Sequence, residues 1–130
     1  MQIDNKLILE IGQLLLASDC AQEDAWDFLS VVFDVSEGHI ANSGFLYAGS
    51  ETEPFSTGID DSAMSLDHKI QFLREQIYQQ TGSKFKQLLV QMKKATGQIK
   101  IQFEFDDPQR WSFSPKNLAT IKEVLRPDFS

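Results

Sequence analysis

The stretch "IKIQFEFDDPQRWSFSP", residues 99–115, contains the most regular pattern in the chain and decides the kind of fold to expect. In its first part, polar residues separate the apolar residues Ile99, Ile101, Phe103 and Phe105. This alternation predicts a strand with one buried face and one wet face. The strand then runs into two adjacent aspartates, a proline, an arginine and a tryptophan, so we expect it to end in an acidic, aromatic corner.

Working outward, the sequence predicts two β-hairpins. Residues 84–94, "KFKQLLVQMKK", precede the alternating strand, and Gly97 between them offers the positive φ of a tight connection. An earlier pair, residues 26–35 and 39–49, is rich in aromatic and β-branched residues and is joined by a short turn. Ser43-Gly44 in its second strand predicts a β-bulge.

Three segments have the spacing of amphipathic helices. They cover residues 5–18, residues 65–80 and a short closing segment within residues 114–129. A loop at residues 50–61 has room for a short strand around Phe55. The order α-β-β-(β)-α-β-β-α predicts a single α+β domain over residues 1–130, with an antiparallel sheet of four to five strands and helices packed on one face.

The length and composition limit the classes of protein to which the chain can belong. The chain has 130 residues, a single cysteine and no apolar run long enough to span a membrane. The N-terminal run "LILEIGQLLLASDC" superficially resembles a lipoprotein signal, but Glu10 interrupts it and Asp19 stands where a small residue should precede Cys20. We therefore expect a cytoplasmic protein.

The net charge of −7 is unevenly distributed. Residues 1–67 hold 13 acidic residues against the single Lys6, whereas residues 68–130 hold 6 acidic residues against 11 lysines and arginines. A strongly acidic surface repels nucleic acid and attracts basic partners. The distribution predicts a protein partner rather than direct nucleic-acid binding, and it leaves the oligomeric state open.

Few residues are candidates for catalysis, metal binding or nucleic-acid binding. Asp60, Asp61, Asp67 and His68 lie close in sequence, but their spacing fits no calcium loop, and a solvated loop leading into a helix explains them equally. Lys93, Lys94 and Lys100 near Phe103 and Phe105 could suggest stacking of bases, but those phenylalanines share a face with Ile99 and Ile101 and are expected in the core. We predict no catalytic residue, no metal and no cofactor.

The acidic clusters are the remaining signal for function. Glu51, Glu53, Asp60 and Asp61 fall in one predicted loop, Asp106 and Asp107 end a strand, and Glu23, Asp24 and Asp27 flank the first strand. Any one of these clusters is also typical of a solvated face. Several clusters in loops and at strand ends, on a protein without catalytic residues, favour binding to a basic partner. The predicted partner-binding residues are Glu51, Glu53, Asp60, Asp61, Asp106, Asp107 and Trp111. For Trp111, an exposed anchor and a core position under the closing helix both remain open.

Residues 99–115, followed by the helix "NLATIKEVL" at residues 117–125, resemble the YezG-like family of bacterial immunity proteins. The resemblance covers roughly residues 85–125, and the region after Trp111 is shorter than in some members. It implies a cytoplasmic protein that inhibits a toxin of competing cells, often a nuclease, by occupying its active site without chemistry of its own. An adaptor or chaperone for another cytoplasmic protein and a metal-assisted hydrolase are the alternatives.

Overall fold

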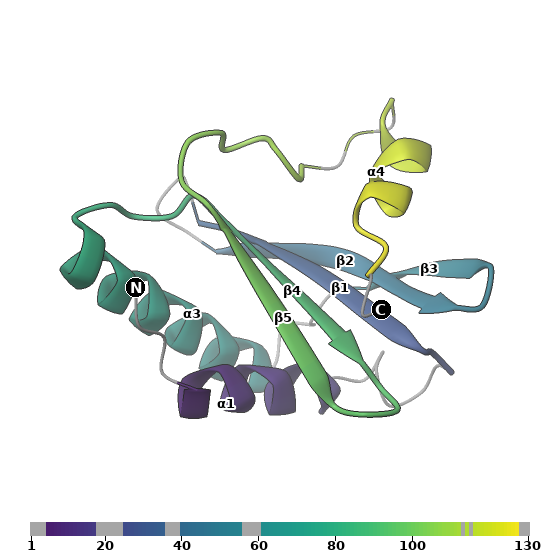
Figure 1. The fold of residues 1–130 in the computed structure, drawn as a ribbon, viewed down its shortest axis with the longest axis horizontal. Helices are drawn as coiled ribbons and strands as arrows, with labels where there is room; N and C mark the ends of the chain where they lie inside the picture. The colour runs from purple at the N-terminus through teal and green to yellow at the C-terminus, as the bar shows by residue number, and fades with distance from the viewer. Residues whose placement is uncertain are drawn as a thin grey trace.

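The computed structural model describes residues 5–17, 25–35, 40–55, 61–112, 114 and 116–127, with the backbone alone at residues 55 and 61–65. Its elements confirm the predicted order and the α+β class (Figure 1). None of the described helices combines the length and the apolar character needed to cross a membrane. The elements are α1 (Asn5–Leu16), β1 (Phe28–Asp34), β2 (Ala41–Ala48), β3 (Glu51–Phe55), α3 (Asp61–Thr81), β4 (Gln87–Lys93), β5 (Gln98–Glu104) and α4 (Leu118–Val124).

The five strands form one antiparallel sheet in the order β3-β2-β1-β4-β5. The two predicted hairpins, β1–β2 and β4–β5, join through β1 and β4 at the centre. The short strand expected near Phe55 is β3, which adds an outer strand to the first hairpin. β3 is an edge strand and contains Pro54, which has no backbone N–H to donate and is tolerated at an edge.

The predicted bulge at Ser43-Gly44 is wrong. The pairing of β1 with β2 is continuous, with Val31 opposite Gly44 and Val32 opposite Ser43. Gly44 has a different role, because a Cβ atom built on it would lie 1.9 Å from the backbone oxygen of Ser30. The glycine therefore permits a close approach of two backbones, which is the other common reason for glycine within a strand.

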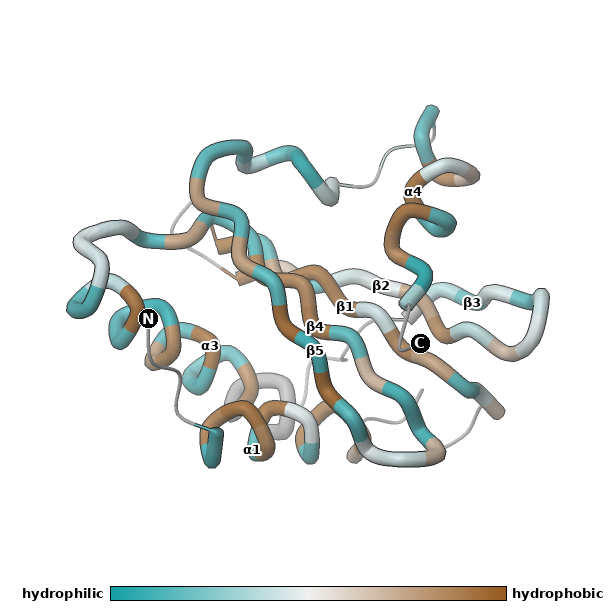
Figure 2. The backbone as a smooth tube through the Cα atoms, in the orientation of Figure 1, coloured by the Kyte–Doolittle hydropathy of each residue, from teal (hydrophilic) through white to brown (hydrophobic). Residues whose placement is uncertain are grey.

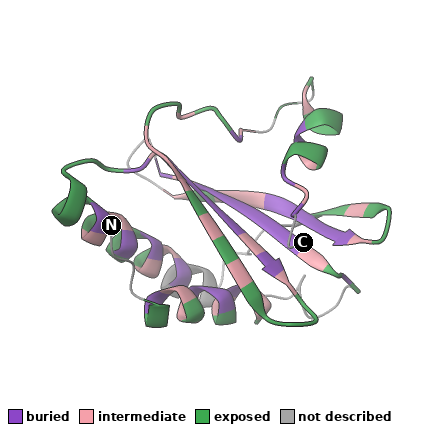
Figure 3. Ribbon diagram, viewed as in Figure 1, coloured by how far each residue is buried: buried purple, intermediate pink, exposed green. Residues whose placement is uncertain are grey.

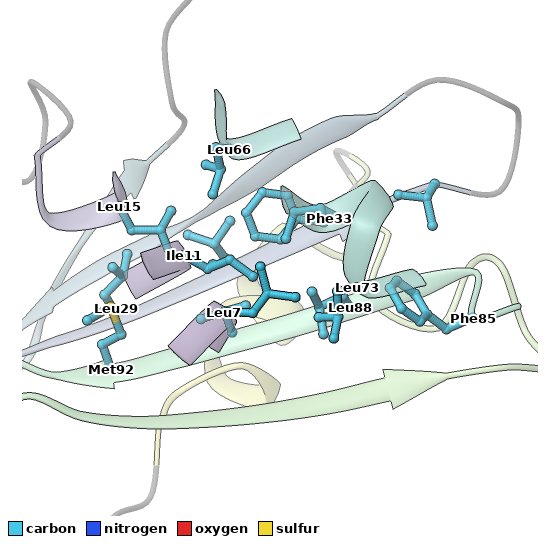
Figure 4. Close-up of a cluster of buried hydrophobic side chains, with 14 of the residues drawn as sticks. Leu7, Ile11, Leu15, Leu29, Phe33, Leu66, Leu73, Phe85, Leu88 and Met92 are labelled. Atoms are coloured by element: carbon cyan, nitrogen blue, oxygen red, sulfur yellow. The ribbon is translucent and has the colours of Figure 1, made fainter. Parts of the chain in front are cut away.

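One face of the sheet, here called the first face, is covered by α1 and α3 (Figure 1). Alternate residues of β1, namely Leu29, Val31 and Phe33, point into this core, and residues from both helices pack on them (Figure 4). An ion pair between Lys69 and Glu10 links the two helices at the surface. The alternating burial along β5 is visible in Figure 3 and agrees with the pattern that defined this strand.

The opposite face, the second face, is covered by α4, so the prediction that the helices pack on one face is wrong for this helix (Figure 1). The reason is that β1 and β4 carry consecutive apolar residues, such as Val31-Val32 and Leu88-Leu89, and are apolar on both sides (Figure 2). Such a face must be covered. Its core consists of Val32, Phe45, Tyr47, Leu89, Trp111, Ile121 and Leu125.

The described residues between Phe105 and Pro127, here called the strap, are held to the second face by polar side chains of the sheet. Tyr47 donates its hydroxyl hydrogen bond to the Lys122 carbonyl at 2.7 Å, and burial raises the pKa of this phenol. Gln91 donates to the Leu125 carbonyl at 3.0 Å, and Ser30 donates to the same oxygen. These bonds satisfy carbonyl groups that the end of a helix leaves without partners.

Candidate functional site

β5 ends in a corner, here defined as residues 104–112, that is organised by Glu104. Its Oε2 accepts hydrogen bonds from the backbone N–H groups of Asp106 at 3.0 Å and Asp107 at 3.1 Å, and its Oε1 pairs with Arg110 Nη1 at 2.8 Å. The backbone bonds from Asp106 and Asp107, with help from Arg110, lower the pKa of Glu104 from 4.5 to about 2. The carboxylate therefore closes the turn that follows the strand.

Asp106 and Asp107 are exposed, as a binding role requires, but they are not equivalent. Asp107 Oδ1 accepts the backbone N–H of Gln109 at 2.8 Å, which is the local bond of an Asx turn. Lys86 donates to the Asp106 carbonyl at 3.0 Å. Three acidic residues (Glu104, Asp106, Asp107) against two cations (Lys86, Arg110) leave the corner one net negative charge, less than the sequence alone suggests.

Trp111 lies in the second-face core, and its relative exposure is only 3%. The Arg110 guanidinium lies over its indole ring, 4.8 Å from the centroid. The sequence left two positions open for Trp111. The prediction of an exposed anchor is wrong, and the prediction of a core position is confirmed. The physical reason is the apolar second face of the sheet, which a large apolar side chain of the strap has to cover.

The other predicted acidic residues lie elsewhere. Glu51 and Glu53 are exposed on β3, at the opposite edge of the sheet from β5. Four strand spacings separate these edges, roughly 19 Å. Asp61 is the first residue of α3 rather than part of a loop, and its side chain is not described. Asp60, Glu23 and Asp24 lie outside the described residues. The predicted partner-binding carboxylates whose side chains are described therefore form two separate groups, one at the corner and one on β3.

The metal alternative involves Asp60, which lies outside the described residues, and Asp61, whose side chain is not described. Within the described ranges, no group of three His, Cys, Asp or Glu side chains could hold a metal ion. His68 is exposed on α3, and burial raises the pKa of Asp67 beside it. Phe103 packs against Phe85 with ring centroids 5.0 Å apart, and both Phe103 and Phe105 contact the first-face core, as expected.

A pocket of about 330 Å³ lies beside the corner, between the strap and the second face of the sheet. Its floor consists of Val32 and Asp34 from β1 and Ala41 and Ser43 from β2. On this face β2 presents two small residues, Ala41 and Ser43, followed by the large Phe45 and Tyr47. The large residues fill the space under α4, and the small ones leave the hollow.

The walls of the pocket are fixed by Gln87, which is fully buried on β4. Its Oε1 accepts the backbone N–H of Trp111 at 2.9 Å, and its Nε2 donates to Ser112 Oγ at 3.3 Å. Gln109, Trp111 and Ser112 form the strap side. The sequence analysis did not predict this pocket. Asp34 and Gln87 are polar residues in otherwise apolar strands, and they could have indicated that a polar partner or a cavity lies against this face of the sheet.

Neither a model of a known protein family nor a curated protein matches the chain. The resemblance to YezG-like immunity proteins therefore stays a prediction. Function has to be inferred from the chemistry of the corner, the pocket and the acidic edge at β3.

Proposed function

We propose that this protein is an immunity protein that binds a cognate toxin domain, in particular a nuclease, and blocks its active site with an acidic surface. The observation that carries the proposal is the concentration of charge, with 13 acidic residues against one lysine in residues 1–67. Exposed carboxylates at the corner and along β3 support it. The partner is a protein, and no cofactor takes part.

The physical basis is mimicry of phosphate. A nuclease site must be cationic to hold its substrate, so carboxylates placed over it compete with the nucleic acid and accelerate the encounter. Asp106 and Asp107 stand on a turn that Glu104 holds in place, so little conformational entropy is lost on binding. Glu51 and Glu53, on the far edge of the sheet, contribute to the long-range field rather than to the same contact.

The direct test is protection and co-purification. The C-terminal domain of the protein encoded immediately upstream is expressed with and without this chain. We expect growth to be restored and a stable complex to be isolated. A toxic upstream domain that neither binds this chain nor is neutralised by it would contradict the proposal.

A matched pair of charge reversals tests the role of the corner. We expect Asp106→Lys to weaken toxin binding about tenfold, or ~1.4 kcal/mol, because it places a cation against a cationic site. Glu75→Lys changes the net charge equally on the exposed surface of α3 and should have a smaller effect, mainly on the association rate. Kinetic binding measurements at two ionic strengths separate these effects. Equal losses for both variants would remove the corner from the interface.

A further inference from the structure

The two edges of the sheet differ in how well they are protected against pairing with another chain. β3 is short and contains Pro54 and the carboxylates of Glu51 and Glu53. Proline and charged side chains are common means by which proteins prevent an edge strand from pairing. β5, the other edge, is seven residues long, contains no proline and pairs with β4 without interruption (Figure 1). Among the described elements, no strand lies on its outer side.

The hydrogen-bond pattern shows which backbone groups of β5 face this open edge. The Lys94 N–H donates to the Asp27 carbonyl at 3.0 Å, so even-numbered residues along β4 bond with β1 and odd-numbered ones bond with β5. The odd-numbered residues of β4 are paired with the even-numbered residues of β5. The N–H and C=O groups of Ile99, Ile101 and Phe103 therefore point to the open edge.

The side chains of these three residues lie on the first face, at the rim of its core. They are only partly buried, because β5 has a neighbouring strand on one side alone. A strand added at the edge would cover them if it carried apolar residues at alternate positions on the same face. A second copy of β5 meets this condition, because opposite residues of an antiparallel pair share both a face and a hydrogen-bonding state. Two copies of β5 can therefore pair the apolar row only with itself.

The charges of the hairpin favour an antiparallel second copy. At the start of β5, three lysines stand against one carboxylate, which leaves two net positive charges. These residues are Lys93, Lys94 and Lys100, with Asp27 beside Lys94. The corner at the other end of β5 keeps one net negative charge. An antiparallel arrangement brings the positive end of each strand beside the negative end of the other, whereas pairing at β3 would bring the carboxylates of both copies together.

We propose that β5 is a dimer interface, at which it pairs antiparallel with β5 of a second copy about a two-fold axis at Ile101. This register pairs every residue of the strand. Ile101 faces Ile101 of the other copy and Ile99 faces Phe103, and each such pair exchanges two backbone hydrogen bonds. Lys100 faces Gln102 of the other copy, so no like charges lie opposite each other. The proposal does not depend on the proposed function.

The first experiment measures the oligomeric state of the full chain by sedimentation equilibrium at concentrations from about 1 µM to about 500 µM. We expect a monomer–dimer equilibrium with a Kd on the order of 10 µM, because one strand pair buries less surface than a permanent dimer does. A chain that stays monomeric throughout this range would overturn the proposal.

Hydrogen exchange at the two ends of this concentration range locates the interface. The amides of Ile99, Ile101 and Phe103 should become protected as the concentration rises. The amides of Lys100 and Gln102 point to β4 and should be protected at every concentration. A dimer in which the three outward amides gain no protection would overturn the assignment to β5.

Opposite charges at position 102 test the register. Gln102 is exposed, so neither variant should disturb the fold. Gln102→Glu places a carboxylate opposite Lys100 of the other copy and should lower the Kd about fivefold, and Gln102→Lys should raise it about fivefold. Gln71→Glu and Gln71→Lys, the same changes on the exposed surface of α3, are the matched controls and should have little effect. Equal dissociation constants for the two Gln102 variants would overturn the proposed pairing.

A second pair of variants tests the backbone bonds. Ile101→Ala and Ile101→Pro both shorten the side chain, but only proline removes an N–H that points to the open edge. We expect Ile101→Ala to raise the Kd about fivefold and Ile101→Pro to abolish the dimer. Full dimerisation of a folded Ile101→Pro variant would overturn the proposal, and the Gln102 variants decide the matter if this variant does not fold.

The toxin domain provides the remaining alternative, since one of its strands could add to the same edge. In that case the free chain would be monomeric, and the outward amides of β5 would gain protection only when the toxin domain binds. This result would overturn pairing with a second copy and support the proposed function. A dimer that neither binds nor neutralises the toxin domain would contradict the proposed function and leave the β5 interface intact.

Discussion

The two faces of the sheet are covered in different ways, although the same central strands form both. The first face is closed by the helices α1 and α3, and its contacts are almost entirely between apolar side chains. The second face is closed by the strap, which includes the seven-residue helix α4, and the buried polar residues Ser30 and Gln87 help to hold it. Two helices cover the first face with apolar side chains, whereas the cover of the second face is thinner and is held partly by hydrogen bonds, and a pocket lies beneath it where β2 carries small residues.

Adjacent residues of β4 test this difference directly. Leu88 points to the first face and Leu89 to the second, with relative exposures of 0% and 4%. We expect Leu88→Ala to lower the free energy of unfolding by about 4 kcal/mol, because two helices hold the cavity open, and Leu89→Ala by about 2–3 kcal/mol, because the strap can settle into the space. Urea unfolding of both variants measures the difference. A larger loss for Leu89→Ala would show that the second face is the more tightly packed one.

A smaller and more local effect is expected when the polar attachment of the strap is removed. Gln87→Ala leaves the buried Trp111 N–H without its acceptor and should cost about 2 kcal/mol. Hydrogen exchange should accelerate at Trp111 and Ile121, while the amides of α3 keep their protection. Gln102→Ala on the exposed side of β5 is the matched control and should change neither. Uniform acceleration across both faces would mean that the strap does not open separately.

The same difference explains how much of the molecule the sequence could predict. Alternation in residues 99–105 and helical spacing in α1 and α3 reflect one-sided burial, so the hairpins, the helix order and the first-face core could be predicted. The position of α4 could not, because two apolar sides of a central strand give no periodic signal. Trp111 carried the same ambiguity, since a tryptophan beside charged residues suits both a core and an interface.

The candidate site was predicted less completely than the fold. The acidic pair at Asp106-Asp107 is exposed at a strand end, as expected. Its countercharges are not local in sequence, however, because Lys86 comes from the start of the preceding hairpin. The pocket depends on β1, β2, the start of β4 and residues 109–112 meeting on one face, and only the strand order places these four segments together.

The smallest expected effect concerns the corner, where the strap leaves β5. Because the pKa of Glu104 in the folded protein is about 2 and its ordinary value is 4.5, its contribution to stability is complete above pH 4.5 and is lost as the pH falls through about 2. We expect the amide signals of Asp106 and Asp107 to shift with that low midpoint, while the first-face amides do not follow it. In Glu104→Gln the transition should vanish. A midpoint near 4.5 would mean that Glu104 does not hold the turn, and the corner would then lack the rigidity that its proposed binding role uses.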